Sequence, residues 1–460
     1  MSSLFSILGT MGDAMMAQQA GLNVTGQNVA NVSTPGYTEE TAELQTTVDG
    51  SVEATGVDRS FDAFAFGQVT QQTGLKGAAD ARSEALQAAQ SVLAPTGGGD
   101  IGSALSSFFA SFNALAATPS DPSARTSVLS QATQLAQTIS STATGLQQQQ
   151  SAMLTQASGI VTQVNGDLSG IASLNDQIAQ AQAEGDPSAS LCDQRDTLVT
   201  DVASAMGAQV VSDPSGSITL FAGGSVLVDG NNAATLAVNQ SSTGAMDFTA
   251  TQGSGPPADI TAGVTTGSLG GLREARDTDI ASAMSQLDTF AYDLSNAVNT
   301  VQQAGYGLDG VTGRPLFTPP TQVAGAAAGM AVDPSVAGNP DAIAASSTAA
   351  GLPGGNDVAN ALAQLANQPL GGAGTPAASF AAITSGLGDA VAAATTDSTT
   401  RADTLTQAQN LESSSDGVSL EEETAKLTQF QQAFQASTQV LQVASTLLQD
   451  LMTTMSNAGA

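Results

Sequence analysis

The stretch LFSILGTMGDAMMAQQAGLNVTGQNVANV, residues 4–32, places apolar side chains alternately four and three positions apart. This spacing is typical of a coiled-coil heptad seam. The seam positions are Leu4, Leu8, Met11, Met15, Gln18, Leu22, Thr25, Val29 and Val32. The C-terminal stretch has a second seam at Leu427, Phe430, Phe434, Ser437, Leu441, Ala444, Leu448, Leu451 and Met455. We therefore predict that the two ends of the chain form helices that pair.

Both terminal seams are nearly free of charge. Asp13 is the only charged side chain between Met1 and Ser33, and Asp450 is the only one after Leu427. Because a solvent-facing helix normally carries a charged face, we expect these helices to pack on more sides than one partner helix covers. We predict that other subunits supply the remaining cover, and that both termini are disordered or fluctuating in the free subunit. The predicted assembly interface comprises Leu4, Leu8, Met11, Met15, Leu22, Val29, Phe430, Phe434, Leu441, Leu448 and Leu451.

The first helix is predicted to end within the block Asn28–Tyr37. Pro35 disfavours helical backbone at Thr34, and Pro35 followed by Gly36 suits the central positions of a type II turn. The chain should change direction here.

The rest of the chain alternates helical and extended patterns. Residues 38–60 predict a β-hairpin turning at Asp49-Gly50, and the period of two between residues 206 and 265 predicts a small antiparallel sheet. Helical periodicity predicts helices at 61–93, 103–117, 128–184, 189–205 and 269–303, with Gly185, Asp186 and Pro187 ending the longest. Residues 305–355 are Gly/Ala/Pro-rich and weakly patterned, and short helices are predicted at 357–367 and 377–412.

These patterns predict a mainly α fold with a small antiparallel β subdomain. The subunit should be elongated, with paired terminal coiled-coil helices at its base and a long helical bundle above. We expect three domains: a terminal coiled-coil domain (1–35 plus 417–460), a helical body (36–205 plus 266–416) and a β subdomain (206–265).

Composition excludes several functions. The net charge of −31 repels nucleic acid and anionic membrane surfaces. With one cysteine, Cys192, and no histidine, the chain has no disulfide framework, Cys/His metal site or Ser-His-Asp triad. The first residues lack the basic region of a secretory signal, and no stretch approaches the roughly 18 apolar residues of a membrane span. We expect no enzyme, no cofactor, no metal and no membrane partner.

Several sequence blocks carry a family resemblance. The run NVTGQNVANVSTPGY, Asn23–Tyr37, resembles the signature of bacterial flagellar axial proteins, which include rod, hook and hook-associated proteins. Its turn residues are Asn28, Asn31, Thr34, Pro35, Gly36 and Tyr37. Further blocks resemble the family of the first hook-associated protein, found at the hook–filament junction; they are Pro119–Ile139, Leu191–Val202, Gly267–Asp277, Ala304–Phe317 and Gly417–Met452.

This resemblance implies a structural subunit of the bacterial flagellum that joins hook to filament. It implies self-association into a tube or ring, contacts with the hook protein and the second junction protein, and an export chaperone on the C-terminal helix. It also implies an extracellular location reached through the flagellar type III system. Family members often carry an inserted outer domain after the segment resembling Ala304–Phe317, and here only Gly/Ala-rich chain and short helices follow.

Other functions stay open at this point. The chain could be another flagellar axial protein of hook or rod type. A coiled-coil scaffold outside the flagellum would explain the seams, although such scaffolds usually carry charges at the e and g positions. A secreted enzyme or sugar-binding module on the β region has no supporting site residues.

Overall fold

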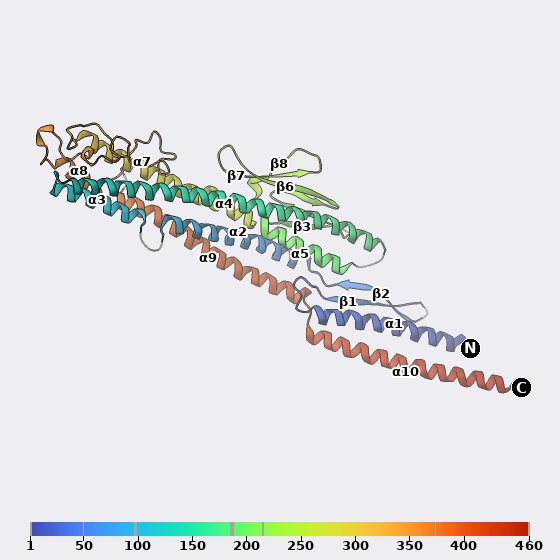
Figure 1. Ribbon diagram of the computed structural model, residues 1–460. Coiled ribbons are helices and arrows are strands. Elements are labelled where there is room, and N and C mark those ends of the chain that lie inside the picture. The colour runs from blue at the N-terminus through green and yellow to red at the C-terminus, as the bar shows by residue number, and fades with distance from the viewer. Residues whose placement is uncertain are drawn as a thin grey trace.

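The computed structural model describes residues 2–48, 50–95, 99–184, 188–213, 216–372 and 374–458. Long helices lie side by side in an elongated body, and the N and C ends lie together at one end of it (Figure 1). The predicted mainly α fold, with a small antiparallel sheet and paired terminal helices at the base, is confirmed.

The helices are α1 (Ser2–Asn31), α2 (Ala63–Leu93), α3 (Ile101–Ala117), α4 (Pro122–Ala183), α5 (Ala189–Met206), α6 (Gly267–Glu274), α7 (Ala281–Ala304), α8 (Asp357–Gln364), α9 (Pro376–Asp416) and α10 (Leu420–Ala458). A π-helical turn, Ala275–Ile280, joins α6 to α7. Short 3-10 turns lie at Thr261–Gly263, Pro340–Ala342, Ala349–Gly351 and Leu365–Asn367.

The strands form two antiparallel units. The hairpin consists of β1 (Glu40–Thr46) and β2 (Val52–Arg59). The six-stranded sheet follows chain order from β3 to β8, with bounds Gln209–Ser212, Ile218–Ala222, Ser225–Asp229, Asn232–Gln240, Met246–Gln252 and Ala258–Asp259.

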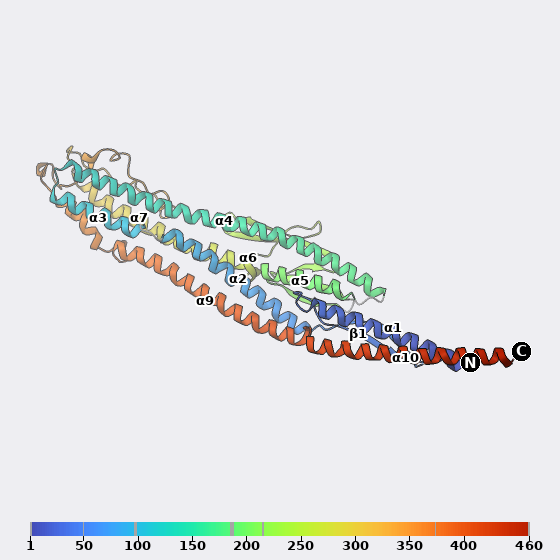
Figure 2. The ribbon, with the colours of Figure 1, turned by 60° about the horizontal axis from the view of Figure 1, so that its bottom comes forward.

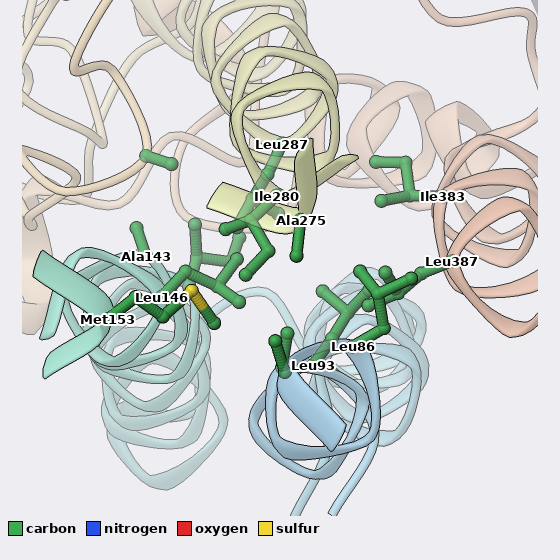
Figure 3. Close-up of a cluster of buried hydrophobic side chains, with 14 of the residues drawn as sticks. Leu86, Leu93, Ala143, Leu146, Met153, Ala275, Ile280, Leu287, Ile383 and Leu387 are labelled. Carbon is green, nitrogen blue, oxygen red and sulfur yellow. The ribbon is translucent and has the colours of Figure 1, made fainter. Parts of the chain in front are cut away.

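The body is a bundle in which α4 supplies the largest share of the core, joined by α2, α3, α7, α9, the six-stranded sheet and the segment after α7. Figure 3 shows Leu86 and Leu93 of α2 facing Leu146 of α4, with Leu287 of α7 and Leu387 of α9 closing the cluster. These leucines are at most 4% exposed. Aspartates at the N-caps start three helices by accepting backbone N–H groups: Asp62 starts α2, Asp100 starts α3 and Asp121 starts α4.

The six-stranded sheet packs on the C-terminal half of α4. Asn165 of α4 donates to the Leu236 carbonyl oxygen at 2.9 Å and accepts from the Leu236 amide at 2.7 Å. Asn175 makes the same pair of bonds with Ile218, at 3.0 and 3.1 Å. Two asparagines on one helix thus fix the register of the sheet against the bundle.

The Gly/Ala-rich segment after α7 covers the end of the body farthest from the termini. Phe317 is fully buried against Phe108 of α3, with ring centroids 5.7 Å apart. Asn299 of α7 accepts from the Leu316 and Phe317 amides and donates to the Phe317 carbonyl oxygen. This segment therefore packs on the bundle although it contains few regular elements.

At the other end, α1 and α10 lie side by side (Figures 1 and 2). Gly21 of α1 allows the closest approach, because a Cβ there would lie 2.6 Å from the Phe430 ring of α10. The second side of α1 contacts the β1–β2 hairpin.

The helix expected at 377–412 is observed as α9, which spans 41 residues and runs along α2. A different helix prediction was wrong in detail. The expected continuous helix at 269–303 is interrupted by the π-helical turn, which directs the buried Arg276 toward the carbonyl oxygens of Gln150 and Gly244. The predicted turn and break residues Asp49, Gly97, Gly98, Gly185, Asp186, Pro187, Pro214 and Ser215 lie outside the described residues.

The helical run Pro376–Asn457 contains an 18-residue window with a mean hydropathy of 1.3, of which 22% is buried. By length and composition alone this window could cross a membrane, so the expectation that no stretch approaches this limit was wrong. Alanine raises the mean without forming a continuous run of large apolar residues.

Candidate assembly interface

The signature turn connects α1 to the hairpin and has the predicted type II geometry. The Tyr37 amide donates to the Thr34 carbonyl oxygen at 3.2 Å, and Gly36 has φ +78°. A side chain at Gly36 would also meet Thr197 of α5, whose Oγ1 lies 2.9 Å from the position of a Cβ. The Asn31 side chain accepts from the Thr34 hydroxyl at 3.2 Å, which ties the end of α1 to this turn.

Asn28 is the centre of a buried polar network at the base of the body. Its amide nitrogen donates to the Glu40 carbonyl oxygen at 2.7 Å and to Glu423 Oε2 at 2.9 Å. Its oxygen accepts from the Tyr37 hydroxyl at 2.8 Å and from the Glu40 amide at 3.0 Å. Both donors and both acceptor positions are therefore used, and one fully buried side chain joins α1, the turn, β1 and α10.

Glu423 is fully buried, and Lys426 compensates its charge. Lys426 donates to Glu423 Oε1 at 2.8 Å and to Glu39 Oε1 at 2.5 Å. Burial lowers the pKa of Lys426, but its bonds to Glu39 and Glu423 outweigh burial and raise it overall. Burial, with Glu40 and Asp193 nearby, raises the pKa of Tyr37, so its hydroxyl stays a donor. We call Asn28, Tyr37, Glu39, Glu40, Glu423 and Lys426 the hub.

Beside the hub, Arg59 at the end of β2 connects the hairpin to α5. Its Nη2 lies 2.8 Å from Asp196 Oδ2, and its Nε lies 2.8 Å from Asp193 Oδ1. The Arg59 guanidinium also lies 4.6 Å from the centre of the Phe61 ring. Burial lowers the pKa of Arg59, but the carboxylates of Asp196 and Asp193 raise it overall, so the guanidinium stays charged.

The link between α9 and α10 is tied to the same place. Asp416, 4% exposed, accepts from the Asp62 amide with both carboxylate oxygens at 3.0 Å. The Asp416 carbonyl oxygen accepts from the Glu39 amide at 2.9 Å. The starts of α2 and β1 therefore hold the position from which α10 leaves the body.

The signature turn separates two clefts. A cleft of about 480 Å³ lies between the turn, α5 and the end of α9, and its charged lining residues are Arg59, Asp196, Asp201, Glu412 and Asp416. A second cleft of about 380 Å³ lies on the other side, toward Asp193. Across the described ranges, no group of three or more His, Cys, Asp or Glu residues is arranged to hold a metal ion.

The structure places the C-terminal seam residues against α1. Phe430, Phe434, Leu441 and Leu448 are half-buried, and Leu451, near the free end, is 39% exposed. On α1, the predicted residues Leu4, Leu8, Met11, Met15, Leu22 and Val29 are also half-buried. The most buried positions of α1, however, are Ala17, Gly21, Val24, Thr25 and Asn28. The buried stripe is thus shifted by one position toward small residues, and at Gly21 the Phe430 ring of α10 packs closely against α1.

Large apolar side chains remain uncovered on both terminal helices. On α10, Val440, Val443, Leu447, Met452 and Met455 are 45–61% exposed. On α1, Phe5 and Met16 are 60% and 64% exposed. Extended apolar surface of this kind usually marks a protein–protein contact.

Sequence reasoning missed Arg59, Asp193, Asp416, Glu423 and Lys426. Glu423 lies in the first turn of α10 and is fully buried. The available signal was the scarcity of cations: the chain has ten Lys and Arg residues, and Lys426 is the only one after Arg401.

The comparisons with known proteins identify the class first. The family model for "Flagella basal body rod protein" matches residues 8–38, and that for "Flagellar basal body rod FlgEFG protein C-terminal" matches residues 407–454. These matches cover the paired ends of the chain and define an axial structural protein of the bacterial flagellum. The family model for "Flagellar hook-associated protein FlgK helical domain" matches residues 86–317, half of the chain. The chain therefore belongs to the flagellar hook-associated protein FlgK family.

Relatives agree with this assignment. Flagellar hook-associated protein 1 of Escherichia coli K12 is 26% identical over 97% of this chain and 99% of the relative. The protein of the same name from Salmonella typhimurium LT2 is 29% identical over 68% of this chain and 59% of the relative. The solved structure of the flagellar hook junction protein FlgK from Burkholderia pseudomallei is 29% identical, with a TM-score of 0.51 over 55% of this chain and 46% of that chain.

The alignment with the Escherichia coli relative is longer than this chain. It spans 547 positions, whereas the chain has 460 residues. Part of the relative therefore has no counterpart here, in keeping with the few regular elements between Phe317 and α8.

Proposed function

We propose that the chain is a structural subunit of the flagellar hook–filament junction and that α1 and α10 line the inner wall of a tube of identical subunits. One observation carries this proposal. The apolar faces of α1 and α10 are left half-exposed, on helices with almost no charge, in the segments matched by the axial-protein models. Neighbouring copies in a tube would cover these faces.

The rest of the subunit suits a mechanical adaptor. The body has its own filled core, and the hub fixes the direction in which the terminal pair leaves it. We propose that the hook protein contacts the assembly from below and the second junction protein from above. The subunit would reach the distal end of the hook through the flagellar type III channel, with an export chaperone on α10 beforehand.

The proposal includes an order of folding. In the free subunit α1 and α10 would be disordered or fluctuating, because their pairing leaves much of their apolar surface in water. Amide hydrogen exchange of the purified chain tests this. Residues 5–32 should exchange rapidly, while residues 128–168 of α4 remain protected. Full protection of residues 5–32 in the monomer would contradict this order of folding.

Mutation of α10 tests the function itself. The double variant Val443→Glu/Leu447→Glu places charges on the exposed apolar face, and cells that carry it should retain hooks while losing attached filaments. The matched control is Gln286→Glu/Ser285→Glu on an exposed part of α7, which should leave filaments attached. The amount of each variant in the culture medium shows whether export occurred. Attached filaments in cells carrying the α10 variant, at the level of the control, would refute the proposed function.

A further inference from the structure

Helix α4 carries a long surface without charge. No Asp, Glu, Lys or Arg occurs between Arg125 and Asp167. This absence is notable in a chain in which 11% of residues are charged, because a run of this length on a solvent-facing helix would normally carry several charges. At about 1.5 Å per residue the uncharged run is roughly 60 Å long.

Ten of the exposed residues of this run form a regular stripe. They recur at alternating spacings of four and three, which makes a straight line along a helix. All ten are exposed and all are serine, threonine or glutamine: Ser130, Gln134, Gln137, Ser141, Thr144, Gln148, Ser151, Thr155, Ser158 and Thr162. We call these ten residues the neutral stripe. Several of its hydroxyls donate to carbonyl oxygens of their own helix, as Thr155 does at 3.1 Å and Thr162 at 2.9 Å.

A second segment extends this uncharged surface. Residues 315–332 also contain no charged side chain. Part of this segment borders a groove of about 760 Å³ that four residues of the neutral stripe line from the other side: Gln137, Ser141, Thr144 and Gln148. Met330 and Val332 supply apolar lining. The surface is therefore a shallow groove with hydroxyl and amide groups on one side and apolar groups on the other.

We infer that the neutral stripe and its groove are the lateral contact of the body with a second copy of this chain. Two copies with a net charge of −31 each repel one another unless they meet where charge is absent. Serine, threonine and glutamine both donate and accept hydrogen bonds, so they can contact an uncharged surface of another copy without burying a charge. This inference rests on the assembly proposed above and concerns a surface separate from the terminal helices.

The position of α4 in the bundle also indicates which surface of the neighbouring copy contacts it. Figures 1 and 2 show α4 and α9 along opposite long sides of the bundle. A contact between two different faces can repeat around a ring or tube, whereas α4 against α4 would close a dimer. The outer face of α9 begins with small uncharged residues, among them Ala378, Ala382 and Ser385. The occupant of the groove is thus α9 of the neighbouring copy.

Photo-crosslinking in assembled flagella tests the contact. A benzoyl-phenylalanine in place of Thr144 should attach to α9 of another copy, yield species larger than a dimer and map to that helix by mass spectrometry. The same group in place of Leu447 reports assembly through the terminal helices. Attachment of the Thr144 probe to α4, to another protein or to nothing, while the Leu447 probe still joins copies, overturns this inference and leaves the proposed function standing. No joined copies from either probe would overturn both.

Charge placement gives a second test. Gln137→Glu/Gln148→Glu adds like charges at the contact and should lower the fraction of cells with attached filaments by about tenfold. The matched control Asn231→Asp/Asn239→Asp adds the same charge at exposed positions of the sheet and should leave that fraction unchanged. Both variants should unfold at the wild-type denaturant concentration, because all four residues are exposed. Equal filament counts for the two variants would overturn the inference.

Discussion

The body bundle and the terminal helix pair are both helical, but they differ in how they satisfy their apolar surface. In the body, leucines and phenylalanines of α2, α3, α4, α6, α7, α8 and α9 are buried within the same chain. In the pair α1–α10, Ala17, Val24 and Ala444 are the only apolar side chains among the described residues to be fully buried. The difference teaches that this subunit carries a self-sufficient part and a part whose stability depends on its neighbours.

The hub differs from both regions. It stabilises through charge and hydrogen bonds: Asn28, Glu423 and Lys426 join segments almost four hundred residues apart. If one partner of a buried network is missing, the remaining polar groups lose hydrogen bonds without regaining water. This free-energy cost favours the one geometry in which every partner is present. The hub thus sets the direction of the terminal pair without requiring a large apolar contact.

The largest expected effect contrasts the two apolar regions. Phe108 is fully buried among Phe109, Phe112 and Phe317. Phe108→Ala should lower the free energy of unfolding by about 3–5 kcal/mol. Leu447, 53% exposed, is the matched position on α10. Leu447→Ala should change the free energy of unfolding by less than about 0.5 kcal/mol. Urea unfolding of the purified chain measures both, and a comparable loss at the two positions would show that α10 belongs to the cooperative core.

The second prediction breaks the hub. Asn28→Ala removes four hydrogen bonds and leaves the Glu423 carboxylate buried with one oxygen unpaired. The protection of the Glu40 amide should fall by about 2–4 kcal/mol in opening free energy. Hydrogen exchange of the assembled subunit, in which α1 and α10 are folded, followed by mass spectrometry measures this protection. Asn31→Ala is the control, because Asn31 bonds only within its own helix and turn. Unchanged protection in Asn28→Ala would show that the hub does not hold the base together.

The comparison of the body with the terminal pair also shows which features the sequence could predict and which it could not. The seam on α10 follows the observed burial as far as Leu448, whereas Leu451 and Met455 near the free end are exposed. On α1 the buried stripe passes through Ala17 and Gly21, and Phe430 of α10 lies against Gly21. Small residues at close contacts give no hydrophobic signal.

The bounds of α9 were predictable, because the expected range 377–412 lies within the observed helix Pro376–Asp416. Most of the hub was missed. Glu423 and Asn28 are ordinary polar residues in the sequence, and their burial depends on contacts between segments far apart in the chain. The type II turn was predictable, because Pro35-Gly36 is sufficient to specify it locally.

The third prediction concerns that turn. Gly36→Ala places a side chain at positive φ and against Thr197, whereas Gly50→Ala meets the same φ with nothing within 4 Å. Positive φ alone should cost about 1–2 kcal/mol of stability in either variant. Gly36→Ala should lose more stability than Gly50→Ala, because only its new side chain meets a neighbour. The unfolding midpoints of both variants measure this. Pro35→Ala and Gly36→Val should also reduce filament attachment more than they lower the melting temperature, and equal losses would count against an assembly role for the turn.

The smallest expected effect is a pH dependence in the cleft between the hub and α9. Burial raises the pKa of Glu412, and Asp416 and Asp196 raise it further against the opposing effect of Arg59. A carboxyl whose pKa is higher in the folded state binds its proton more tightly there. Its contribution to stability is therefore fully present below the unfolded pKa and is lost as the pH rises through the folded value.

Glu412→Gln removes this group's titration and keeps its shape. The difference in unfolding free energy between Glu412→Gln and the wild type should favour the variant at neutral pH and shrink as the pH falls through the folded pKa of Glu412. Taking this difference cancels the opposite contributions of Asp100 and Asp357, whose pKa values are lowered by hydrogen bonds from Ser103 and Ser347. Asp389→Asn, on the exposed face of the same helix, is the control for removal of one carboxylate outside the cleft. A difference for Glu412→Gln that does not change with pH would show that the cleft carries no buried charge to relieve.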